Sequence, residues 1–206
     1  MPAPIPALML QIFSFGSITL IVVPVLLVLF FVTILVRQYR RCPSNRILVV
    51  YGKVAGARAA KCLHGGGTFV IPLLQSYEYL SLEPMTIEID LAAALSKKNI
   101  RVNVPSTFTI GISTQPDIMN NAAERLLGLS DKEIAAQSRD IILGQMRLVI
   151  ATLSIEEINQ DREKFLDLVN KNVSTEVNKI GLELINVNVR DITDESGYIE
   201  ALGQKA

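Results

Sequence analysis

The residues with chemically reactive side chains are few and lie far apart in the sequence. His64 is the only histidine, so the chain has no pair of imidazoles to bind a metal, and no evident nucleophile accompanies His64 as a general base. The glycines at residues 65–67 belong to the motif GGGTFV, which lacks the Lys-Ser/Thr pair that a phosphate-binding loop needs. These patterns predict no catalytic residue, no metal ligand and no cofactor, and we interpret His64 as structural.

The two cysteines also give no sign of a metal or redox site. Cys42 and Cys62 are not part of a CxxC motif and have no second soft ligand nearby in sequence. We expect reduced thiols in a cytosolic domain. Cys42 follows an apolar segment by six residues, a position where S-palmitoylation occurs in some membrane proteins. Two interpretations of Cys42 stay open, a lipidated cysteine and a plain one.

The longest apolar stretch lies near the N-terminus and limits where the rest of the chain can act. Residues 18–36 contain no charged side chain, and 16 of these 19 residues are Ile, Leu, Val or Phe. A helix of this length extends about 28 Å, close to the ~30 Å hydrocarbon thickness of a bilayer. The side chains that we expect inside the bilayer include Ile18, Leu20, Val25, Leu29, Phe30, Phe31, Ile34 and Val36. Because Pro24 would kink the helix, both a single transmembrane span and a re-entrant wedge are open geometries.

Basic residues follow this stretch immediately. Arg37, Arg40 and Arg41 come after the apolar run, whereas no charged side chain precedes it. The positive-inside rule therefore places the C-terminal part in the cytoplasm, and we expect these arginines to contact lipid head groups. Residues 37–80 carry seven basic and one acidic side chain, whereas residues 81–206 carry 13 basic and 19 acidic ones. The acidic second half and the lack of aromatics among the basic residues argue against nucleic acid binding.

Beyond the arginines, residues 45–113 predict an antiparallel, strand-rich unit. The segment RILVVYGK is rich in β-branched residues, and Ile87, Ile89 and Leu91 alternate with polar residues in MTIEIDL. The same period-two alternation returns in NIRVNV and FTIGI.

Residues 114–193 predict helices followed by a strand. A short helix with proline in its first turn ends before Gly128, and two S-x-x-E capping boxes, Ser130 to Glu133 and Ser154 to Glu157, each begin another helix. A further helix over about 161–180 places Phe165, Val169, Val173 and Val177 on one face and ends at Gly181. In the strand that follows, we expect Ile185, Val187 and Val189 on one face, and another helix begins near Tyr198.

Several of these segments together resemble a known family. The motifs are GGGTFVIPLLQ, AAERLLG, RDIILGQMRLVIATLSIEEINQDREKF and GYIEALG, in this order. They resemble the flotillins of the SPFH (stomatin/prohibitin/flotillin) superfamily, and the hydrophobic N-terminal segment is most similar to the bacterial type. The resemblance implies an α+β fold, with a transmembrane or re-entrant helix followed by an SPFH (band 7) domain. It divides the chain into an anchor (1–41), a strand-rich, membrane-proximal subdomain (42–114), a helix-bearing subdomain (115–193) and the start of a helix leading to a coiled coil (194–206).

The resemblance also implies a function. Flotillins assemble into large homo-oligomeric rings or cages, organise membrane microdomains, and recruit other membrane proteins as clients. We therefore expect a non-enzymatic scaffold on the cytoplasmic side of the plasma or bacterial inner membrane, with lipids as partners. Two alternatives are a prohibitin-like enclosure that regulates a membrane-bound protease, and a membrane-bound enzyme with an unrecognised active site.

A second contact with lipid is expected from an apolar segment in the strand-rich unit. Phe69, Val70, Ile71, Leu73 and Leu74 lie close together around Pro72, and we expect them to dip into the head-group layer. The alternative is that they form a buried strand of the sheet.

Overall fold

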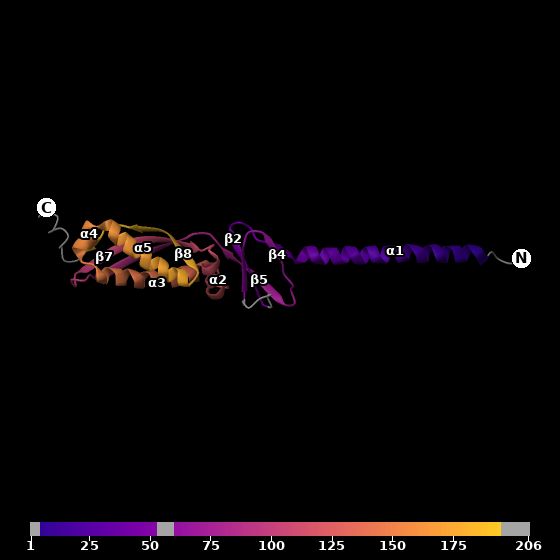
Figure 1. Ribbon diagram of the computed structural model, residues 1–206, viewed down its shortest axis with the longest axis horizontal. Coiled ribbons are helices and arrows are strands. Elements are labelled where there is room, and N and C mark those ends of the chain that lie inside the picture. Colours follow the sequence, from indigo (N-terminus) through magenta and orange to yellow (C-terminus); the bar gives the residue numbers. More distant parts are fainter. Residues whose placement is uncertain (1–4, 53–59, 195–206) are drawn as a thin grey trace.

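The computed structural model describes residues 5–52 and 60–194. For residues 5–21 it describes the backbone alone. Helix α1 (Ile5–Gln38) projects from one end of the folded part, and helices α3 to α5 lie toward the other end (Figure 1). The helix expected to begin near Tyr198 lies outside the described residues. The elongated arrangement separates the α1 end from the helix-covered end of the molecule.

Helix α1 continues through Pro24 without a break in its assignment. Side chains are described from Val22 onwards, and those from Val22 to Val36 are exposed. The side chains of Ile18 and Leu20, expected in the bilayer, lie outside the described part. Among the described residues, no helix is both long enough and apolar enough to cross a bilayer.

The strand-rich part next to α1 contains a two-stranded ribbon and a three-stranded sheet. The ribbon pairs β1 with β4, and the sheet has the order β3-β2-β5, both antiparallel. Strand β2 is buried on both faces: Ile47 and Val49 join the main core, whereas Leu48 and Val50 pack in a small separate cluster. The strands are β1 (Tyr39–Arg41), β2 (Arg46–Gly52), β3 (Ala60–His64), β4 (Gly67–Phe69) and β5 (Gln75–Ser81).

A second antiparallel sheet has β7 as its central strand, between β6 and β8. Its strands are β6 (Met85–Leu95), β7 (Arg101–Ile112), β8 (Leu182–Val189) and the short β9 (Thr193–Asp194), which also pairs with β7. The predicted alternation in β6 is confirmed, because Ile87, Ile89 and Leu91 are buried and the residues between them are exposed. Since β7 pairs with β8, this sheet joins strands from both sides of the expected division between residues 114 and 115.

Helices pack against the second sheet and complete the main core. They are α2 (Pro116–Arg125), α3 (Asp131–Thr152), α4 (Ile155–Gln160) and α5 (Arg162–Lys179). Helix α3 contacts β6 and α5, and α5 also contacts β8 (Figure 1). The predicted apolar stripe of α5 is confirmed: Phe165, Val169, Val173 and Val177 are completely buried. A stripe at i, i+4, i+8 and i+12 lies along one side of a helix, so it fixes which face of α5 meets the core.

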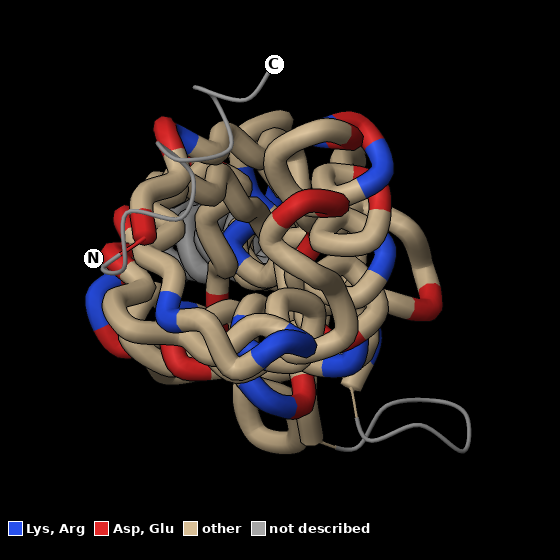
Figure 2. Tube along the Cα trace, turned by 90° about the vertical axis from the view of Figure 1, so that its left-hand side faces the viewer, with Lys and Arg blue, Asp and Glu red and all other residues tan. Residues whose placement is uncertain are grey.

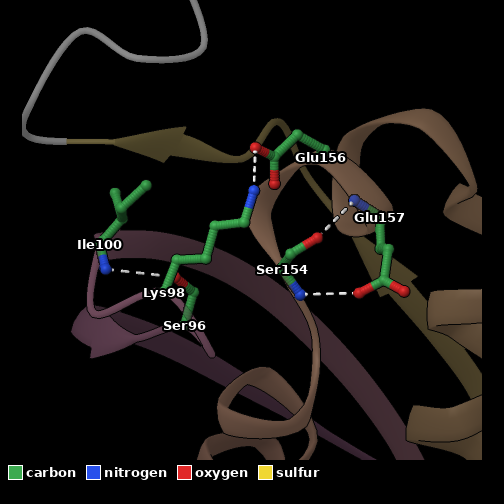
Figure 3. A network of polar contacts seen from close by, with 6 residues as sticks. All are labelled: Ser96, Lys98, Ile100, Ser154, Glu156 and Glu157. Carbon is green, nitrogen blue, oxygen red and sulfur yellow. Dashed lines mark hydrogen bonds and ion pairs between the residues drawn. The ribbon is translucent and has the colours of Figure 1, made fainter.

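Both predicted capping boxes are present. Ser130 begins α3 and Ser154 begins α4, and each hydroxyl accepts a hydrogen bond from the backbone N–H three residues later. The carboxylate of Glu157 accepts in return from the backbone N–H of Ser154 at 2.9 Å (Figure 3). That backbone hydrogen bond is the main reason why the pKa of Glu157 is lowered. The caps satisfy N–H groups that an α-helix cannot pair internally.

The turn between β6 and β7 is attached to the junction of α3 and α4. The backbone N–H of Lys97 donates to the carbonyl of Leu153 at 2.9 Å, and Lys98 Nζ forms an ion pair with Glu156 Oε1 at 2.6 Å (Figure 3). These contacts hold the end of the long β6–β7 hairpin against the helical layer.

The expected pattern in the last long strand is wrong at one residue. Val189 is buried and Val187 is partly buried, but Ile185 is 52% exposed. The cause is a shift in the pairing of β7 with β8, where Thr109 faces Asn186 and the next residue, Ile110, faces Leu184. Ile185 is therefore the extra residue of a β-bulge, which interrupts the alternation of faces.

Candidate membrane-binding site

The end of the folded part next to α1 is built around the β1–β4 ribbon. Helix α1 runs directly into β1, and the backbone N–H of Val70 donates to the carbonyl of Gln38 at 3.0 Å. The glycine run forms the turn before β4, where Gly65 and Gly66 adopt φ of 78° and 76°, a backbone that glycine adopts without steric cost. At Gly67 a Cβ atom would lie 2.6 Å from the Tyr39 hydroxyl oxygen and 2.9 Å from the backbone carbonyl oxygen of Arg40, which cannot move aside. The ribbon therefore needs glycine there for close approach.

Aromatic side chains hold the ribbon and its arginines in place. The rings of Tyr39 and Phe69 pack with centroids 5.2 Å apart, and the Arg40 guanidinium carbon lies 4.9 Å from the centroid of the Tyr77 ring. The Tyr79 hydroxyl donates to the carbonyl of Arg41 at 3.1 Å. Of the arginines expected at the head groups, Arg37 therefore lies in the last turn of α1 and Arg40 and Arg41 lie in β1. Arg40 has a fixed stacking partner.

The segment of residues 69–74, called the apolar loop below, presents large apolar side chains to solvent. It leaves β4 and turns at Ile71, whose carbonyl accepts from the N–H groups of Leu74 and Gln75. Its exposed apolar side chains are Phe69 (59%), Ile71 (47%), Leu73 (94%) and Leu74 (52%). Exposure of this extent does not fit the alternative of a buried strand.

Val70 does not belong to the exposed set that the sequence predicted. It is only 4% exposed and packs with Cys42, Leu48 and Val50 in the small cluster. Its backbone hydrogen bond to Gln38 holds it against the strand-rich part, so it positions the apolar loop instead of reaching outward.

Cys42 is buried, and this corrects its interpretation as a lipidation site. Its thiol lies 3.1 Å from the carbonyl oxygen of Arg46 and 3.3 Å from that of Leu63, both of which can accept from the S–H group. A thiol enclosed in this way is not accessible for acylation in the folded chain. At Cys62, burial and the nearby Glu124 carboxylate raise the thiol pKa to about 11, so this cysteine stays protonated.

The rest of the described chain offers little that resembles a reaction centre. His64 lies exposed on β3, and no group of three or more His, Cys, Asp or Glu among the described residues is placed to hold a metal. Seen from the end opposite α1, basic and acidic positions are interspersed around the molecule (Figure 2). In the described residues, arginines and exposed apolar side chains occur together where α1 meets the ribbon.

A known protein family matches the folded part of the chain that follows α1. The model of the SPFH domain / Band 7 family matches residues 40–206, which begin at the ribbon and include both sheets and all helices after α1. The chain belongs to the SPFH domain / Band 7 family. The matched region begins within β1, two residues after the last residue of α1.

Individual relatives are flotillins. The chain is 28% identical to the flotillin-like protein FloT of Bacillus subtilis over 84% of its length, and 28% identical to flotillin-2 of Carassius auratus over 78%. It is 26% identical to human flotillin-1 over 79% of its length. These matches cover 36%, 37% and 38% of the respective relatives, so the chain spans little more than a third of the relatives' length. The resemblance to flotillins predicted from the sequence motifs is confirmed.

The sequence pattern indicated the arginines and the apolar loop as candidate lipid contacts, but it did not indicate the aromatic residues that support them. Tyr39 and Tyr77 lie in short strands, where they look like ordinary alternating residues. The only signal was that Tyr39 directly precedes Arg40 and Arg41, as expected for an aromatic residue at a membrane–water boundary.

Proposed function

We propose that this chain is the membrane-attached portion of a flotillin-like scaffold. Helix α1 inserts into the bilayer, as a span or a re-entrant wedge, and the SPFH domain lies on the cytoplasmic face. Copies of the domain assemble side by side into a ring or cage that organises a membrane microdomain and gathers other membrane proteins. The expected location is the plasma membrane or the bacterial inner membrane.

The observation that carries the proposal is the meeting of three features at one end of the domain. The apolar side chains of α1 from Val22 to Val36 are exposed, Arg37, Arg40 and Arg41 follow directly, and the apolar loop presents four exposed large side chains beside them. An apolar surface next to basic residues matches the hydrocarbon and head-group layers of a bilayer. Assembly and microdomain organisation are supported by the similarity to flotillins.

Membrane fractionation of the full chain tests the attachment. We expect the chain to sediment with membranes, to resist extraction by high salt and to be released by detergent. Replacing Leu26 and Leu29 of α1 by arginine should move most of the chain into the soluble fraction, because each arginine near the centre of a membrane helix costs about 2.5–3.5 kcal/mol.

A matched control separates insertion from a general effect of added charge. Leu148→Arg with Ala151→Arg places two arginines at the same spacing on the exposed side of α3, and this variant should remain with the membranes. Wild-type chain in the soluble fraction without detergent would contradict the proposal.

A further inference from the structure

A cleft lies at the base of α1, between the end of that helix, the ribbon and β5. Its volume is about 400 Å³, and its lining includes Arg37, Arg40, Val70, Ser76 and Tyr77. No acidic residue lines it, and among the described residues neither arginine has a carboxylate within ion-pair distance. Two guanidinium groups without a carboxylate partner give the cleft a positive potential.

Arg40 is positioned to bind an anion. Its guanidinium stacks on the Tyr77 ring at 4.9 Å, which restricts the side chain and leaves the N–H groups at the edge of the plane available as donors. A guanidinium whose edge N–H groups are available binds phosphate through two parallel hydrogen bonds. Ser76 adds a hydroxyl and Gln38 an amide to the same lining, so neutral donors accompany the charged ones.

The rim of the cleft indicates the source of the phosphate. Val70 and Pro72 of the apolar loop line the cleft, and the neighbouring side chains of Ile71, Leu73 and Leu74 are exposed. We propose that the cleft binds the phosphate of one anionic phospholipid, whose acyl chains lie along the apolar loop. A free phosphate would use the arginines but gain nothing from this apolar rim. The inference rests on the proposed function, because it requires this end of the domain to face the bilayer.

Lipid titration of the purified full chain in neutral detergent, followed by native mass spectrometry, tests the site. Detergent removes the diffuse surface potential of a membrane, so binding of a single lipid is measured directly. We expect one phosphatidylglycerol to bind at least about tenfold more tightly than phosphatidylcholine, and Arg40→Gln to remove about tenfold of that affinity. Tyr77→Leu should weaken binding, whereas Tyr77→Phe, which keeps the ring, should not.

Arg46→Gln is the matched control, because it removes the same charge from an exposed residue at the start of β2 that does not line the cleft. It should change the affinity by no more than about twofold. Equal losses for Arg40→Gln and Arg46→Gln, or equal binding of the two lipids, would overturn the proposed lipid site. Displacement of the lipid by inorganic phosphate at equal concentration would overturn its assignment to a lipid. The fractionation assay tests the proposed attachment separately from the cleft. We expect Arg40→Gln to sediment with membranes even though its affinity for the lipid is reduced.

Discussion

Replacing Gly181 by alanine is expected to lower the free energy of unfolding by roughly 3–5 kcal/mol. Gly181 connects α5 to β8 with φ of 93°, and a Cβ atom there would lie 2.1 Å from the backbone nitrogen of Ala122. Two costs therefore add: a left-handed backbone that disfavours a side chain, and a collision with the backbone of α2, which cannot move aside as a flexible side chain can. The expected fall in melting temperature is about 10 °C.

Gly144→Ala provides the matched control. Gly144 lies inside α3, and a Cβ atom there would meet nothing within 4 Å. Alanine favours a helix over glycine by roughly 0.5–1 kcal/mol, so this variant should be more stable than wild type. Near-ultraviolet circular dichroism of the full chain in detergent follows the tyrosines of the folded part during heating. A Gly181→Ala variant as stable as wild type would contradict the close packing of this turn against α2.

Phe165→Ala is the second substitution with a large expected effect. Phe165 is completely buried and belongs to the main core, which contains residues of both sheets and of helices α2 to α5. Removing the ring leaves a cavity, which typically costs about 3–5 kcal/mol. Because the core includes Ile47 and Val49 of β2, we expect the strand-rich and helical parts to lose stability together.

Hydrogen exchange measured separately on β2 and α5 checks that coupling. Both elements should exchange faster in Phe165→Ala, whereas faster exchange in α5 alone would contradict a shared core. Leu148→Ala is the control, because Leu148 is 61% exposed on α3 and its truncation should change the stability by no more than about 0.5 kcal/mol.

The parts of the fold that depend on local signals were predictable from the sequence. The caps at Ser130 and Ser154, the stripe of α5 and the stop at Gly181 each depend on residues within one or two helical turns. The alternation in β6 is equally local. Such features need only short-range hydrogen bonds and the period of burial.

Features that depend on contacts between distant residues were not predictable. The pairing of β7 with β8 joins residues such as Phe108 and Val187, and the sequence contains no sign of that register or of its bulge at Ile185. Burial of Cys42 and Val70 likewise comes from packing against β2. The apolar pattern of residues 69–74 could not separate Val70 from its exposed neighbours, because all of them are equally apolar.

The candidate site also combines features that the local sequence predicts with features that depend on contacts between distant residues. Arg37, Arg40 and Arg41 were identified by their position after the apolar stretch, which is a property of the sequence alone. The stacking of Arg40 on Tyr77 joins side chains of β1 and β5, which belong to different sheets, and only the folded chain brings these two residues together.

The central claim is that the end of the domain carrying the apolar loop lies against lipid. Its most direct test is a bimane probe on Leu73→Cys in the full chain, with Cys42 and Cys62 replaced by alanine, in vesicles containing brominated lipids. The account predicts strong quenching at residue 73 and little at Leu148→Cys, another leucine position, which is 61% exposed on α3. Equal quenching at both positions, or none at residue 73, would contradict it.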